Sequence, residues 1–281
     1  MSPDSASAIK ALGNTVLAAG SGLVFGNFLI NLLLQGSLQQ LFSTIKKMQI
    51  LVHMALVNVS LPANASMFFA YLLQIVAFDV VPTDNAYDTI FSFEESKPVT
   101  TNFELMGYES VYAIRNLGSM FLIFILAAMA GAFLAISSIS KSAKVHEYRG
   151  MVKERLFWNG ILSFLNETYI ILCVSFMLNL QVLWDPETPK SHGGTIFSLI
   201  IGITIGIVLI ALPIFIAIYF PMNKDKILEC DYEFKQKFGT VFEELNVKRH
   251  GSAVFALPVY TMARSFILSS TVVFLPQYSN F

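Results

Sequence analysis

Two opposite charges lie in the middle of long apolar stretches of the sequence. Glu167 falls within the stretch 156–183, and Arg264 falls within the stretch 252–275. Each lies about a dozen residues beyond a basic loop, which at about 1.5 Å rise per helical residue places both near the centre of a hydrocarbon core about 30 Å thick. A lone charge at that depth costs about 3 to more than 10 kcal/mol. We therefore expect Glu167 and Arg264 to form an intramembrane charge pair, which either gates a permeation path or only fixes helix packing.

A row of polar side chains precedes Glu167 on its predicted helix. Asn159, Ser163 and Asn166 follow the spacing i, i+4, i+7, which places them on one face. A polar face that ends at a charge is typical of a water-accessible path, and equally of hydrogen bonds between helices. Asp79, near the outer end of another apolar stretch, is a further candidate for a cation site, and its alternative is a carboxylate that reaches the headgroups.

The composition places the chain among polytopic membrane proteins. Of its 281 residues, 55% are hydrophobic and 13% are charged, where soluble domains have about 25% charged residues. The mean hydropathy is +0.63. A net charge of −1 gives no indication of nucleic-acid binding, and two cysteines are too few for a disulfide framework. Because there is no glycine-rich phosphate loop and no histidine cluster of metal-binding type, we expect no enzymatic activity, no cofactor and no metal.

The apolar stretches predict one all-α membrane domain over 1–281, a bundle of six transmembrane helices. A shorter run, 48–61, predicts an interfacial or re-entrant helix, with His53 at the lipid headgroups. Gly202 and Gly206 form a Gly-x-x-x-Gly pair that predicts a packing face, and Pro213 is expected to kink its helix and expose carbonyls. The six predicted spans are 12–34, 62–81, 116–136, 156–183, 195–220 and 252–275.

Lysine and arginine in the loops predict the orientation. The loops 36–48, 141–155 and 221–251 hold thirteen of the eighteen basic residues and are expected in the cytoplasm. The long loop 82–115 is instead acidic and aromatic, and is expected to form an outer cap that concentrates cations. Both chain ends then lie outside. The plasma membrane or a ciliary membrane is favoured, with an organelle membrane left open, and the expected partners are the lipid bilayer and either other membrane subunits or further copies of the chain.

The loop 221–251 contains an amphipathic segment. Phe234, Phe238, Phe242 and Leu245 recur at intervals of 4, 4 and 3 residues, which predicts one face of a helix. This helix is expected either on the cytoplasmic membrane surface or packed beneath the bundle.

Ten short motifs of the sequence point to a known family. They are 49–64, 68–69, 78–84, 102–104, 107–110, 164–169, 178–180, 237–245, 263–264 and 272–275. Together they resemble the C-terminal membrane module of large ciliate surface proteins, which often carry cysteine-rich, growth-factor-receptor-like ectodomains, and the resemblance covers about residues 38 to 275. Members of this family carry paired arginines where this chain has Ala263 and Arg264. More distantly, the layout of 49–62 is similar to TRP-like and polycystin-like membrane proteins.

The resemblance implies a TRP-like bundle with cation-channel activity. Our first interpretation is therefore a multi-pass membrane protein that serves as a cation-channel subunit, with Glu167 and Arg264 paired at mid-depth. The alternative is a non-conducting structural or assembly subunit of a larger membrane complex, in which the same pair fixes helix register. A third, weaker alternative is a transporter of lipid or of a small solute.

Overall fold

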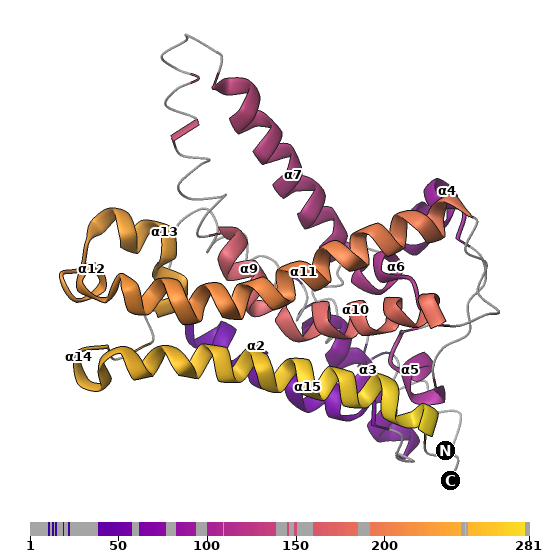
Figure 1. Ribbon diagram of the computed structural model, residues 1–281. Helices are drawn as coiled ribbons and strands as arrows, with labels where there is room; N and C mark the ends of the chain where they lie inside the picture. The colour runs from indigo at the N-terminus through magenta and orange to yellow at the C-terminus, as the bar shows by residue number, and fades with distance from the viewer. Residues whose placement is uncertain are drawn as a thin grey trace.

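The computed structural model of the chain is built of helices, and the residues that it describes include no strand (Figure 1). The described residues are 39–57, 62–76, 83–93, 100–108, 110–138, 145, 149–150, 160–184, 192–242, 245 and 247–278, with the single positions 11, 13, 15, 19 and 22.

The described residues form the following helices, in order along the chain. They are α2 (Gln39–Met54), α3 (Ala63–Val76), α4 (Asp84–Phe91), α5 (Thr101–Leu105), α6 (Ala113–Leu117), α7 (Ser119–Ser137), α9 (Ile161–Glu167), α10 (Tyr169–Trp184), α11 (Gly193–Met222), α12 (Lys224–Leu228), α13 (Tyr232–Phe242), α14 (Val247–His250), the 3-10 helix η2 (Gly251–Phe255) and α15 (Ala256–Tyr278).

Helix α10 forms the centre of the fold. It lies between α11 and α15 and contacts both along much of its length (Figure 1). Apolar residues occupy all sides of this helix, with a few polar side chains among them, and nearly all of its residues are buried in the protein. Helix α11, by contrast, exposes the apolar side chains of Ile200, Ile207 and Ile214 on one face, as expected for a surface that contacts lipid. Helix α7 extends away from these three helices.

Three helices are long and apolar enough to cross a membrane, which supports an integral membrane protein. They are Ser119–Ser137, Gly193–Met222 and Gly251–Leu275, and they match the predicted spans 116–136, 195–220 and 252–275. The stretch 156–183 is divided into α9 and α10, which meet at an angle of 71° and amount to a fourth span only if they are counted together. Helix α3 is a shorter helix within 62–81, and the stretch 12–34 lies largely outside the described residues. The predicted count of six spans is therefore not confirmed.

The Gly-x-x-x-Gly pair of α11 packs directly on α10, which confirms its prediction as a packing face. A Cβ atom at Gly202 would overlap the side chain of Asn179, and a Cβ atom at Gly206 would overlap the ring of Phe176. Glycine at these two positions lets the two helices approach closely.

The proline inside α11 leaves a backbone acceptor that a neighbouring helix satisfies. Because Pro213 has no N–H, the carbonyl of Leu209 four residues earlier loses its helical donor. The hydroxyl of Tyr169, the first residue of α10, donates to that carbonyl oxygen at 2.8 Å, and Tyr169 is buried. The proline therefore specifies a hydrogen bond between α10 and α11.

This relationship predicts a non-additive pair of substitutions. We expect Tyr169→Phe alone to lower the free energy of unfolding by about 1–2 kcal/mol, because it leaves the buried Leu209 carbonyl without a donor. In a Pro213→Ala background the alanine backbone can supply the missing N–H, so the same Tyr169→Phe change should cost much less. Thermal or denaturant unfolding of the four variants in detergent measures the coupling, and strictly additive effects would contradict it.

The amphipathic segment of 221–251 forms α13 and packs beneath the bundle, the second of its two predicted placements. Phe234 and Phe238 are buried, and each lies within 6.1 Å, between ring centroids, of both Tyr219 and Phe220 near the end of α11. These aromatic contacts attach the segment to the last turns of α11, which is long and apolar enough to cross a membrane.

Candidate functional site

Helix α2 directs a row of polar side chains into the protein. Lys46, Gln49 and His53 recur at intervals of 3 and 4 residues, which places them on one helical face. Gln49 and His53 are each 1% exposed, so this polar face is the buried one. Buried polar groups require partners, and each of the three reaches a different segment of the chain.

Lys46 forms an ion pair with Glu167. The Lys46 Nζ lies 3.1 Å from a carboxylate oxygen of Glu167, and the exposed fractions of the two side chains are 34% and 8%. A buried carboxylate is stable when a cation and hydrogen bonds compensate its desolvation, and Lys46 supplies that cation for Glu167. The lysine is only partly enclosed, which places the pair at the edge of the packed interior.

The ion pair lies where the apolar stretch 156–183 breaks. Glu167 ends α9, Tyr169 begins α10, and Thr168 between them bonds back to the preceding helix: its backbone N–H and its hydroxyl both donate to the carbonyl oxygen of Phe164, at 2.9 and 2.7 Å. Glu167 therefore precedes the first residue of α10 by two positions, at the helix end where the dipole favours a negative charge.

The predicted pairing of Glu167 with Arg264 is wrong. Both residues are described, and they form no ion pair with each other. Arg264 is exposed on α15. Helix α15 buries the face that carries Met262, Ser265 and Ser269, and Arg264 lies off that face. Counting residues from a loop predicts the depth of a side chain in the membrane, but it does not predict the direction in which the side chain points from the helix axis.

The other predicted site residues are placed only in part. Ser163 and Asn166 lie half-buried on α9 in the same helix as Glu167. Asn159 and Asp79 lie outside the described residues. The part of the chain that the structure describes contains no group of three or more histidine, cysteine, aspartate or glutamate side chains arranged to hold a metal ion.

Gln49 and His53 complete the polar row of α2. The Gln49 amide donates at 2.8 Å to the carbonyl oxygen of Val76, the last residue of α3. The His53 Nδ1 lies 2.6 Å from the Gln49 carbonyl oxygen, which can only accept, so Nδ1 carries the proton and Nε2 accepts from the Tyr108 hydroxyl at 3.2 Å. Burial lowers the pKa of His53 to about 4. The side chain of His53 is enclosed by the protein and does not contact the lipid headgroups, contrary to expectation.

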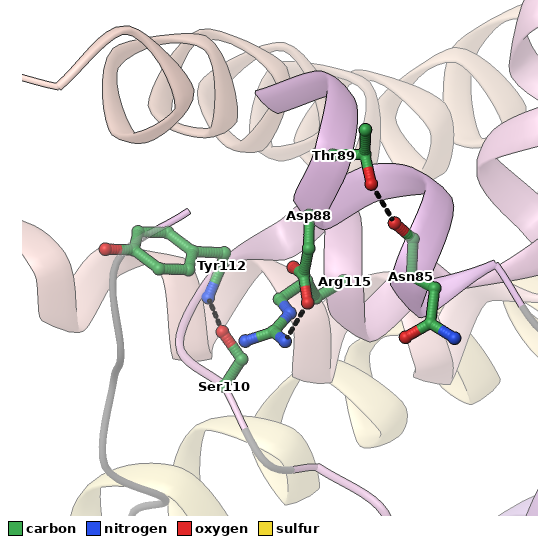
Figure 2. Close-up of polar contacts among 6 residues, drawn as sticks. All are labelled: Asn85, Asp88, Thr89, Ser110, Tyr112 and Arg115. Atoms are coloured by element: carbon green, nitrogen blue, oxygen red, sulfur yellow. Dashed lines mark hydrogen bonds and ion pairs between the residues drawn. The ribbon is translucent and has the colours of Figure 1, made fainter. Parts of the chain in front are cut away.

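Within 82–115 the structure describes three short helices, and a polar contact connects two of them, α4 and α6 (Figure 2). An Arg115 guanidinium nitrogen lies 2.7 Å from a carboxylate oxygen of Asp88, which connects α6 to α4. The backbone N–H of Tyr112 donates to the Ser110 hydroxyl at 3.1 Å just before α6 begins. Figure 2 shows the Arg115 side chain directed at Asp88, so this acidic residue of the loop is neutralised within the protein.

Lys46 is the site residue that sequence reasoning missed. It was assigned to a basic cytoplasmic loop, 36–48, because its charge fits the orientation rule. The spacing of Lys46, Gln49 and His53 was the available signal, since these polar residues share one face of a helix that is otherwise apolar from Met48 on, a pattern that indicates a buried polar contact.

Comparison with protein-family models, with curated proteins and with solved structures finds no match.

Proposed function

We propose that the chain is a subunit of a TRP-like cation channel in which the Lys46–Glu167 ion pair regulates passage of cations. One observation carries the proposal: a buried carboxylate is paired with a lysine at the point where a membrane helix is broken. Interrupted membrane helices and charges within them are costly and occur where ions or polar solutes pass. The predicted plasma or ciliary membrane, the outward chain ends and assembly with other subunits or further copies belong to the same proposal.

The chemistry of the pair supports a role in cation passage. Paired with Lys46, Glu167 contributes no net charge to its surroundings. When the pair separates, the carboxylate becomes a cation ligand next to the half-buried polar side chains of Ser163 and Asn166. Opening and closing of the ion pair would then change the local attraction for cations, which is the property that a gate requires.

The second candidate is a non-conducting assembly subunit, and the polar contacts of α10 favour it. Asn179 bonds to Ser198 of α11 at 2.9 Å, and Gln181 donates to the Val273 carbonyl of α15 at 3.4 Å. Contacts of this kind hold a bundle together without providing a path. In this alternative the Lys46–Glu167 pair fixes α2 against α9 and has no effect on flux.

Charge substitution in reconstituted vesicles distinguishes the two candidates. We expect Glu167→Gln to lower cation flux about tenfold or more, because it leaves the ammonium of Lys46 uncompensated and about 1.4 kcal/mol of added barrier slows a step tenfold. Lys46→Gln should act in the opposite direction by leaving the carboxylate uncompensated. The double variant should return toward the wild-type flux. Conductance and tracer uptake measure all four.

Glu233→Gln is the matched control for these variants. Glu233 is also paired with a lysine, at 3.6 Å from Lys237, but it is 83% exposed and lies on α13. Its substitution removes an equal charge from an exposed site outside the buried pair and should leave flux unchanged. Absence of wild-type conductance in every lipid and voltage condition, together with loss of stability in Glu167→Gln, would contradict the channel and support the assembly subunit.

A further inference from the structure

A cavity of about 410 Å³ lies where α12, α13 and α14 meet. Its volume is within the range of sites that bind small molecules. Three lysines line it, Lys226, Lys235 and Lys248, and one acidic residue, Asp231. The remainder of the wall is largely apolar and includes Phe242. The lining therefore combines basic residues with apolar surface.

Two of these lysines have charges that the fold does not neutralise. Lys226 and Lys248 are exposed and form no ion pair with any described residue. The Lys226 Nζ lies over the ring of Phe234, 6.0 Å from its centroid, a contact that orients the side chain and leaves its charge intact. The carboxylate of Asp231 is occupied in part, because it accepts the backbone N–H of Phe234 at 2.9 Å. The net field in the cavity is positive and attracts an anion.

The positions of the lining residues along the chain indicate where the cavity lies relative to the membrane. The candidate span Gly193–Met222 ends four residues before Lys226, and the candidate span Gly251–Leu275 begins three residues after Lys248. A site enclosed between the ends of two membrane-crossing helices lies at the level of the lipid headgroups. Headgroup phosphates are present there at high local concentration, and the apolar lining residues are suited to the adjoining glycerol and acyl carbons.

We propose that this cavity binds a phosphate monoester, and that its source is the headgroup of an anionic phospholipid. A phosphate monoester carries between one and two negative charges and presents three acceptor oxygens, which suits two uncompensated ammonium groups. The proposal does not depend on cation passage, so the two can be tested separately.

Binding of phosphatidic acid to the purified full chain tests the proposal. Native mass spectrometry in detergent compares phosphatidic acid, whose phosphate is a monoester, with phosphatidylglycerol, whose phosphate is a diester. We expect preferential binding of phosphatidic acid. Lys226→Gln and Lys248→Gln should each weaken it about fivefold, and the double variant about thirtyfold, on the basis of the attraction of single basic residues to anionic lipid. Lys237→Gln is the matched control, because Lys237 lies on α13 but does not line the cavity.

A second measurement uses the wild-type chain alone. Cys230 lines the cavity and is exposed, whereas Cys173 is buried, so alkylation by N-ethylmaleimide reports selectively on Cys230. Phosphatidic acid should slow this alkylation, and phosphatidylglycerol should slow it less. Protection by glycerol 3-phosphate at comparable concentration would show that a soluble phosphate fills the same site. Equal protection by both lipids, or affinity that is unchanged in the Lys226→Gln/Lys248→Gln variant, would overturn the proposal.

Discussion

Gly202→Ala is expected to lower the free energy of unfolding by about 3 kcal/mol, although alanine favours a helix by about 1 kcal/mol over glycine. The new methyl group would overlap the amide of Asn179, which is 2% exposed. The backbone N–H of Ala113 donates to the Ser198 hydroxyl oxygen at 3.0 Å, so the hydroxyl proton is available to the Asn179 amide oxygen. Displacing that amide costs both the overpacking and the buried hydrogen bond.

Two other glycines of α11 provide variants for comparison with Gly202→Ala. Gly206→Ala should cost less, because the group in its way is the far edge of the Phe176 ring, which is half-buried and can turn aside. Gly193→Ala should be close to neutral, since nothing lies within 4 Å of its Cβ position. Denaturant titration in detergent micelles measures all three. Equal costs at Gly202 and Gly193 would show that the contact between α10 and α11 is not as tight as described.

Acidification is expected to destabilise the protein through His53. Its pKa is lowered from 6.5 to about 4 by burial, so the unfolded chain binds the proton more tightly than the folded protein. The contribution of neutral His53 is complete above about pH 6.5 and is lost as the pH falls through about 4. At about 1.4 kcal/mol per pH unit the loss amounts to about 3 kcal/mol.

A comparison of the unfolding free energy of wild type and variant across pH separates the effect of His53 from the effects of the carboxylates. His53→Gln removes the titrating group, so the difference in unfolding free energy between wild type and variant should shrink by about 3 kcal/mol between pH 7 and pH 4. His192→Gln is the control, because His192 is exposed at the start of α11. A pH-independent difference for His53→Gln would mean that water reaches the imidazole in the folded state.

Helix type and position were largely predictable from the sequence, because apolar stretches of membrane length have few alternatives to a helix. The stretches 195–220 and 252–275 appear as single long helices close to their predicted limits. The break at Thr168 was not predicted. Its neighbours are uniformly apolar or helix-compatible, so the interruption depends on tertiary contacts, among them the hydrogen bonds that Thr168 makes to Phe164.

Only one of the two charged residues of the candidate site was predicted from the sequence. The intramembrane acid Glu167 could be identified because a lone carboxylate in an apolar stretch requires compensation. Its partner could not be identified by matching depths, since Arg264 and Lys46 are both bases and only the packed faces of α15 and α2 decide which one turns inward. The same limit applies to Pro213: the sequence predicts that a carbonyl is released, and only the fold brings Tyr169 to it.

The 71° angle between α9 and α10 bears on the Lys46–Glu167 ion pair, because only Glu167 belongs to the bent segment. The two helices are joined through one residue, so a change in their angle must be absorbed by the backbone torsions of Thr168. Lys46 belongs to neither helix, because it projects from α2. In the channel that we propose, a change in the bend would therefore change the distance between the carboxylate of Glu167 and the ammonium of Lys46, so a displacement of α9 would alter the local charge.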